Sequence, residues 1–287
     1  MPLTHLGMLR FTGADALSFL QGQVSNDTRR LSAGIPLLAA YSNPQGRVLT
    51  LIYLLPHSSG LIAILPRELL QPTLERMRKF VLRAKVRIED AGESLVLAGH
   101  IGELAGPREG YAEEDGIGLA RVSHDDGRHW VLAAPGRLAR DADQGASRRT
   151  ELAWRLADIR AGLPQIYTAT SEAFVAQMLN LDLLDAISFT KGCYTGQEII
   201  ARTQHLGRIK RRLFRLQLPA GTWRIGQALH LSDGRQGRLT EVIESDGRIE
   251  ALAVLSVEAS AAADGASDGS AEMRVNAGEL PLPYELS

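Results

Sequence analysis

The chain is poor in cysteine, aromatic residues and net charge, and each scarcity excludes a class of protein. Cys193 is the only cysteine among 287 residues, so one chain cannot form an internal disulfide or supply all ligands of a thiolate zinc or iron–sulfur site. Lysine and arginine number 32 and aspartate and glutamate 33, for a formal charge of -1. That balance does not suit a protein that binds polyanions over its whole surface, although it allows a local charged patch.

Long apolar segments are absent as well. The longest run, VLTLIYLL at residues 48–55, is far shorter than the ~20 residues of a membrane-spanning helix. The beginning of the chain, MPLTHLGMLRFTG, has neither the basic region nor the long apolar region of a secretory signal. We therefore expect a cytoplasmic monomer that does not contact membranes.

The pattern of the first half predicts an α+β fold with mostly antiparallel sheets. Strand-like segments at residues 36–42 and 46–55 flank the turn Asn43-Pro44-Gln45-Gly46, which is a strong hairpin signal. Strands that are neighbours in sequence, with helices between some of them, are typical of this fold class. A helix is predicted over residues 151–162, ELAWRLADIRAG, with Pro164 just beyond it.

The last third of the chain has a different pattern. From residue 208 onward, short strands alternate with Ser-Asp-Gly and Asp-Gly turns, which predicts a small β-barrel. We therefore predict two domains, a larger region over residues 1–206 and the C-terminal barrel over residues 207–287. The segment at residues 259–271, rich in Ala, Ser, Gly and Asp, is predicted to be a loop between two barrel strands.

The most informative segment is KGCYTGQEIIAR, residues 191–202. Its TGQE run has the form of a capping box, which predicts that Thr195 is the N-cap of a helix. Cys193 would then lie close to the positive end of the helix dipole, with Lys191 two residues upstream. Both effects favour thiolate and predict a lowered pKa for Cys193. The alternative is a small buried residue with an inert thiol.

Positive charge is concentrated after this segment. No acidic residue falls between Ile199 and Ser232, which predicts a local positive field for a partner rich in carboxylates or phosphates. The cations in this stretch are Arg202, Arg208, Lys210, Arg211, Arg212, Arg215 and Arg224. The first five of these form the predicted basic patch. The alternative is a solvated strand edge protected by charge, and the lack of aromatics apart from Phe214 does not favour a groove for single-stranded nucleic acid.

The signature KGCYTGQEIIAR, followed by LGRIKRR, closely resembles that of the YgfZ family, the folate-binding relatives of the glycine-cleavage T protein. The blocks FTGADALSFLQGQVSNDTRRL and AAYSNPQGRV also resemble blocks of this family, and the resemblance covers nearly the whole chain. The signature positions are Lys191, Gly192, Cys193, Tyr194, Gly196, Gln197 and Glu198. The resemblance implies T-protein-like (GcvT-like) lobes in a clover-leaf around a central opening that binds tetrahydrofolate or a related folate. It also implies a role in maintaining iron–sulfur enzymes, including those that methylthiolate tRNA.

Two aromatic residues are candidates for folate binding. Trp154 resembles a pterin-contacting tryptophan of the family. It lies about 200° from Leu152 around the predicted helix, at ~100° per residue, so we expect it to face away from the apolar stripe and to be free to stack on a flat ring. The alternative is a tryptophan packed between lobes. Tyr41 resembles the tyrosine at the floor of the folate cleft in the T protein.

Catalysis of aminomethyl transfer is not expected. The T protein, which this chain resembles along GRVLTLIY, carries a carboxylate pair where Thr50 and Leu51 stand. Neither of these side chains can exchange a proton near neutral pH. A folate-dependent one-carbon transferase, or aminomethyltransferase, remains an alternative that would need a carboxylate such as Asp27 or Asp158. A third interpretation is a tRNA-binding module that uses residues 202–224, whose binding would weaken steeply with salt.

The leading hypothesis is a folate-binding protein that supports iron–sulfur enzymes such as tRNA methylthiotransferases and makes at most weak contact with tRNA. Cys193 would be its reactive thiol, in transient contact with a cluster. One thiol per chain cannot hold an iron–sulfur cluster alone, so such ligation would be transient or shared.

Overall fold

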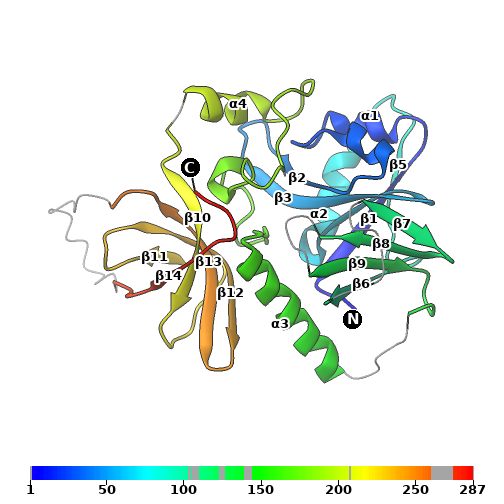
Figure 1. Ribbon diagram of the computed structural model, residues 1–287. Coiled ribbons are helices and arrows are strands. Elements are labelled where there is room, and N and C mark those ends of the chain that lie inside the picture. The colour runs from blue at the N-terminus through cyan, green and yellow to red at the C-terminus, as the bar shows by residue number, and fades with distance from the viewer. Residues whose placement is uncertain are drawn as a thin grey trace.

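The protein was analysed as a computed structural model, which describes residues 2–102, 104, 110–122, 127–138, 144–206, 208–259 and 274–286. Three antiparallel sheets and a few helices make up this part of the chain (Figure 1). The predicted α+β class is therefore confirmed. The helices within these ranges include none that is long and apolar enough to cross a membrane.

The first sheet has the order β2-β3-β4-β1-β5. Its strands are β1 (Leu6–Thr12), β2 (Leu37–Ser42), β3 (Val48–His57), β4 (Gly60–Pro66) and β5 (Arg87–Asp90). The predicted hairpin joins β2 to β3, where the Asn43 amide donates to Arg47 O at 2.9 Å and the Gly46 amide donates to Asn43 O at 2.9 Å. Gly46 has a φ of 69°, a conformation that glycine adopts without strain.

Both faces of the first sheet are buried. One face packs against α1 (Ala16–Gln21), the 3-10 helix η1 (Thr28–Ala33) and α2 (Arg67–Arg78). The other face packs against the second sheet, whose order is β6-β9-β8-β7. The strands of that sheet are β6 (Val96–Ile101), β7 (Tyr111–Glu114), β8 (Ile117–Arg121) and β9 (Arg128–Ala133). Successive residues of a strand point to opposite faces, which explains why neighbouring residues of β2 and β3 belong to two different cores.

Helix α3 (Gln144–Ala161) runs between the second sheet and the C-terminal sheet (Figure 1). It ends as predicted, because Gly162 follows it with a φ of 65° and Pro164 comes next. Two ion pairs attach the helix to the C-terminal sheet, Arg155–Glu241 at 2.6 Å and Arg160–Glu250 at 2.8 Å. The 3-10 helix η2 (Ala176–Leu179) and α4 (Gln197–Leu206) follow α3.

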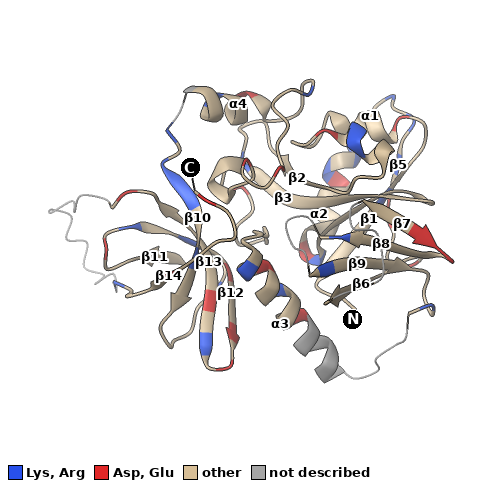
Figure 2. Cartoon of the chain, in the orientation of Figure 1, with Lys and Arg blue, Asp and Glu red and all other residues tan. Residues whose placement is uncertain are grey.

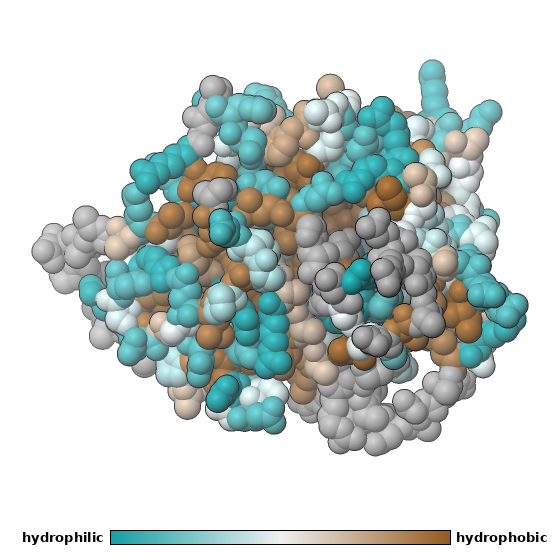
Figure 3. Space-filling model, viewed as in Figure 1, coloured by the Kyte–Doolittle hydropathy of each residue, from teal (hydrophilic) through white to brown (hydrophobic). Residues whose placement is uncertain are grey.

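The third sheet lies in the C-terminal part and has the order β11-β12-β13-β10-β14. Its strands are β10 (Arg211–Leu218), β11 (Ala228–His230), β12 (Gln236–Ser245), β13 (Arg248–Ser256) and β14 (Gly278–Leu280). A parallel bridge joins Leu231, just after the edge strand β11, to Val275, just before the other edge strand, β14. The two edges of the sheet therefore approach each other, in the direction of the small barrel that the sequence predicts. Apolar residues reach the surface beside β10 on the face shown in Figure 3.

The division of the chain into two domains between residues 206 and 207 stays a prediction. All strands of the third sheet lie after this boundary in the sequence. Most of the predicted loop at residues 259–271 lies outside the described residues.

Candidate functional site

The signature segment lies on the N-terminal part of the chain, and Lys191 is its anchor. The Lys191 side chain is buried, and its Nζ donates to Val24 O at 2.7 Å and to Asn26 O at 2.8 Å. The same ammonium lies 4.9 Å from the centre of the Tyr194 ring. Burial lowers the pKa of Lys191 to about 8, while the negative charge of Asp27 opposes this decrease. Lys191 therefore secures the segment and points into the protein.

Backbone contacts fix the rest of the segment. The Ser188 amide donates to Ser25 O at 2.9 Å and the Thr195 amide donates to Gly22 O at 3.3 Å. Gly196 has a φ of 84°, and a Cβ atom there would lie 2.7 Å from Asn43 O. The signature segment is thus held by two distant N-terminal elements, the loop at residues 22–26 and the β2–β3 turn.

The predicted N-cap is wrong by one residue. Helix α4 begins at Gln197, so Gly196 occupies the cap position and Thr195 lies outside the helix. The reason is the close approach to the β2–β3 turn, which requires a glycine with positive φ immediately before the helix. Glu198 lies in the first turn of α4, where a negative charge is favourable.

Cys193 is exposed, which rules out the alternative of an inert buried thiol. The neighbouring Gly192 is also exposed, and a Cβ atom there would meet nothing within 4 Å. A buried lysine on one side and the buried Tyr194 on the other thus hold an open Gly-Cys pair at the surface. The Cys193 thiol is therefore accessible to solvent.

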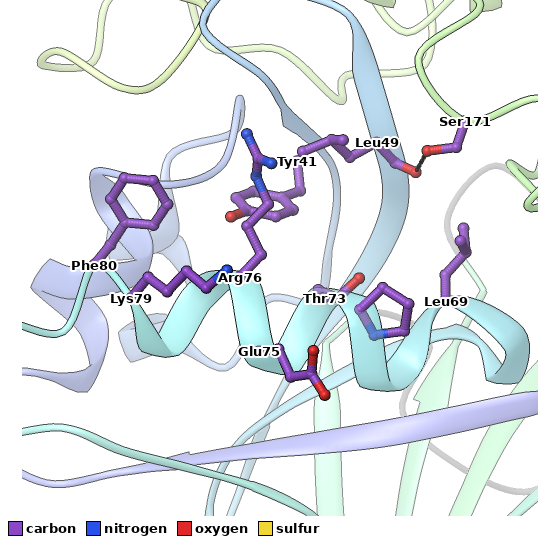
Figure 4. A pocket seen from close by; sticks show the side chains of 10 residues that line it. Tyr41, Leu49, Leu69, Thr73, Glu75, Arg76, Lys79, Phe80 and Ser171 are labelled. Atoms are coloured by element: carbon purple, nitrogen blue, oxygen red, sulfur yellow. Dashed lines mark hydrogen bonds between the residues drawn. The ribbon is translucent and has the colours of Figure 1, made fainter.

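A pocket of about 400 Å³ lies beside Tyr41 (Figure 4). It is lined by Tyr41, Leu49, Leu69, Pro72, Thr73, Glu75, Arg76, Lys79, Phe80 and Ser171. Tyr41 is only 1% exposed, and its hydroxyl forms no well-aligned hydrogen bond with a described residue, although the Arg76 side chain lies within hydrogen-bonding reach of it. Burial raises the pKa of Tyr41, and the positive charge of Arg76 opposes this increase.

The pocket combines apolar and positively charged side chains. Its volume falls in the usual range for small-molecule sites, roughly 300–1,000 Å³. Leu49 and Leu69 supply apolar surface, while Arg76 on α2 and Lys79, the residue that follows this helix, supply positive charge suited to carboxylates. The sequence analysis missed these two cations. Their i, i+3 spacing on a helix, which places both on one face, was the signal that could have revealed them.

Trp154 does not lie in this pocket, and the prediction that its ring is free is wrong. The side chain is 0% exposed. Its ring lies 4.8 Å from that of Trp130 and 4.6 Å from the guanidinium carbon of Arg128, and a Cβ atom at Gly99 would come within 2.3 Å of it. The physical reason is that α3 is covered on two sides, so a residue away from the apolar stripe meets the second sheet instead of solvent. The role of Trp154 in folate binding stays a prediction.

The positions that replace the T-protein carboxylates are buried in β3. Thr50 and Leu51 are both 0% exposed, and the Thr50 hydroxyl donates to Leu51 O at 3.2 Å. The two carboxylates of the alternative interpretation are engaged elsewhere. Asp27 pairs with Arg29 at 2.6 Å, which holds the pKa of Asp27 well below its usual range, and Asp158 pairs with the Arg128 guanidinium at 2.7 Å. Neither aspartate lines the Tyr41 pocket.

The predicted basic patch is not one continuous surface. Arg212 is only 3% exposed, and its Nη1 donates to Asp182 at 2.6 Å and to Gln177 O at 3.1 Å. Arg208 is exposed but pairs with Glu258. The remaining members, Arg202, Lys210 and Arg211, are exposed and form no ion pair with any residue in the described ranges. Figure 2 shows basic residues at the start of β10, and of these Arg211 is exposed and Arg212 is buried.

Comparison with known proteins identifies the family. The tRNA-modifying protein YgfZ of Yersinia pestis (strain Pestoides F) is 32% identical over an alignment that covers 100% of this chain and 94% of the relative. The chain belongs to the YgfZ family. A YgfZ relative from Hamiltonella defensa is also 32% identical, over 80% of this chain and 71% of the relative. No protein-family model matches the chain.

The fold of this YgfZ family member is also that of a known enzyme. The crystal structure of glycine cleavage system aminomethyltransferase T from Bartonella henselae superposes with a TM-score of 0.64 and covers 89% of this chain and 77% of the enzyme. At 13% sequence identity this likeness concerns the fold alone. The T-protein-like fold implied by the signature is therefore confirmed.

Proposed function

We propose that the protein is a cytoplasmic, monomeric tetrahydrofolate-binding protein that supports tRNA modification by iron–sulfur enzymes, without transferring an aminomethyl group itself. One observation carries the folate part of this proposal. A pocket of about 400 Å³ beside the buried Tyr41 combines the apolar Leu49 and Leu69 with the cations Arg76 and Lys79. Tyr41 would donate to or accept from the pterin, and the two cations would hold the glutamate carboxylates.

The tRNA part of the proposal is supported by the relatives, whose name is tRNA-modifying protein YgfZ. Methylthiolation of tRNA is a reaction of iron–sulfur enzymes, and an exposed thiol beside a rigid anchor suits transient contact with iron or with a partner protein. A bound tetrahydrofolate would supply a one-carbon carrier and a reductant. This chain's own residues would bind and orient it.

The absence of aminomethyl transfer follows from proton chemistry. Transfer needs a titratable group within hydrogen-bond reach of the folate nitrogen. Among the described residues that line the Tyr41 pocket, Glu75 is the only carboxylate, and it lies on α2 and not at the position of Thr50. An aminomethyl donor that yields methylene-tetrahydrofolate in the presence of this protein would contradict the proposal and favour the transferase alternative.

Folate binding is tested by titration calorimetry with tetrahydrofolate under anaerobic conditions. Wild-type protein is compared with Tyr41→Phe and Arg76→Gln, and Arg83→Gln serves as a control with the same charge change at an exposed position outside the pocket. We expect tenfold weaker binding or more for Arg76→Gln, since a charged hydrogen bond contributes about 1.5–3 kcal/mol, and unchanged binding for the control. Equal affinity of all variants would remove this pocket from the proposal.

Support of tRNA modification is tested in cells that lack the protein. We expect wild-type protein to restore methylthiolated tRNA and Cys193→Ser to restore much less, while tetrahydrofolate binding by the purified Cys193→Ser variant stays unchanged. Full restoration by Cys193→Ser would show that the thiol has no part in the function. Loss of folate binding in the same variant would show that the thiol and the pocket are not separate.

A further inference from the structure

A second pocket, of about 320 Å³, lies where the third sheet meets the segment before η2. Its described lining consists of Ala173, Phe174, Arg211, Ala228, Leu229, His230, Gln236, Gly237 and Arg238. No carboxylate is among these residues, although the whole chain is nearly neutral. Local excess of positive charge in a concave site attracts anions.

The two arginines of this pocket project from the same face of the third sheet. Arg211 on β10 is paired with Ser256 of β13, and Arg238 on β12 is paired with Val254 of the same strand. Directly paired residues share a face, as do residues two apart on one strand. Because β10 and β12 lie on opposite sides of β13, two strand spacings and an offset of two residues separate the arginines, which is about 12 Å at the Cα atoms. Both are exposed and form no ion pair with a described residue.

A third arginine approaches from the N-terminal part. Arg47, just before β3, is exposed, and its Nη1 donates to Ala173 O at 3.0 Å. Ala173 itself lines the pocket. The contact leaves donors of the Arg47 guanidinium for a ligand, because this group carries five N–H donors. Two arginines from two strands thus line the cavity together with the buried Phe174 and Leu229, and Arg47, the residue before β3, lies next to it through its contact with Ala173.

We propose that this pocket, lined by Arg211 and Arg238 with Arg47 beside it, binds the phosphodiester backbone of RNA. The planar guanidinium matches phosphate in a bidentate manner, and the separation of Arg211 from Arg238 suits a ligand with successive anionic groups better than a single small anion. The proposal rests on the proposed function, which makes tRNA the RNA at hand. Of the predicted stretch at residues 202–224 it uses Arg211 and adds Arg238, while Arg208 is paired and Arg212 is buried.

The test is tRNA binding by fluorescence anisotropy over a salt series, with the full chain. The pocket variant is Arg211→Gln/Arg238→Gln, and the control variant is Arg202→Gln/Arg224→Gln, which removes the same charge from exposed positions outside the pocket. We expect the pocket variant to bind tRNA at least about tenfold more weakly and to lose about two from the slope of log K against log salt. The control variant is expected to change both quantities much less.

Three results would overturn the inference: no tRNA binding by the wild-type protein, unchanged binding by the pocket variant, or equal losses in both variants, which would indicate a diffuse field. Thermal unfolding and tetrahydrofolate titration of each variant verify that it is folded. Folate binding that fails in the wild-type protein would instead count against the proposed function, so the two failures are distinguishable.

Discussion

The backbone of Gly196 lies against that of Gly46, because a Cβ atom added to Gly196 would come within 3.0 Å of the Gly46 Cα atom. This contact joins the signature segment to the β2–β3 turn. It requires glycine on both sides, since Gly46 and Gly196 each have positive φ and a side chain at either position would meet the other segment.

Gly196→Ala should therefore destabilise the protein by about 2–4 kcal/mol, from backbone strain and the clash with Asn43 O. Gly192→Ala is the matched control, because a Cβ atom there meets nothing within 4 Å, and it should change the free energy of unfolding by less than about 0.5 kcal/mol. Urea unfolding of the two variants measures both values. Equal stabilities would contradict the close packing of the two segments.

Lys191 should make stability depend on pH in the alkaline range. Its pKa is about 8 in the folded protein, below the ordinary value near 10.4 of an unfolded chain. Between these values the unfolded chain binds more protons, so the free energy of unfolding should increase as pH rises from about 8 to 10. Urea unfolding between about pH 8 and 10 gives the free energy of unfolding of the wild-type protein and of Lys191→Met. The difference between the two free energies at each pH isolates the contribution of Lys191. A difference that is constant or decreases with pH would contradict it.

Trp154 should matter chiefly for stability. Trp154→Ala removes a fully buried ring and should cost about 3–5 kcal/mol. Trp223 is partly exposed and donates to Pro219 O, so Trp223→Ala should cost clearly less. Chemical unfolding compares the two. If Trp154→Ala were nearly as stable as wild type and bound tetrahydrofolate more weakly, the ring would be a ligand contact, as the sequence analysis expected.

Arg212 and Arg208 belong to the same predicted patch but should respond differently to substitution. Arg212→Met leaves the buried Asp182 carboxylate without its partner and should destabilise the protein by about 3–5 kcal/mol. Arg208→Met removes one member of an exposed pair and should cost about 1 kcal/mol or less. Thermal and urea unfolding of both variants test this, and similar losses would show that Arg212 is not a core residue.

The parts of the fold that the sequence predicted are those set by local chemistry. The Asn43–Gly46 turn and the glycine that follows α3 depend on backbone conformation, which neighbouring residues determine. The N-cap of α4 could not be predicted in this way, because the residue before the helix is selected by a turn about 150 residues earlier.

Side-chain environment was also beyond local reasoning. The helical wheel places Trp154 off the apolar stripe correctly, but a wheel does not show that α3 has a second covered side. A count of charges likewise finds Arg212 but not Asp182, its partner in a different segment. The cations of the Tyr41 pocket were missed because the apolar stripe of α2 accounts for that helix without them.

The hydrogen bonds of residues 188–196 to residues 22–26 impose an order on folding. During synthesis the first sheet is made long before the signature segment leaves the ribosome, and pairing over such a separation is entropically costly and slow. The surface that surrounds the thiol is consequently completed only when most of the polypeptide exists. Every chain long enough to contain Cys193 already contains the residues that hold it, so only a deletion near the N-terminus would leave the cysteine without these contacts.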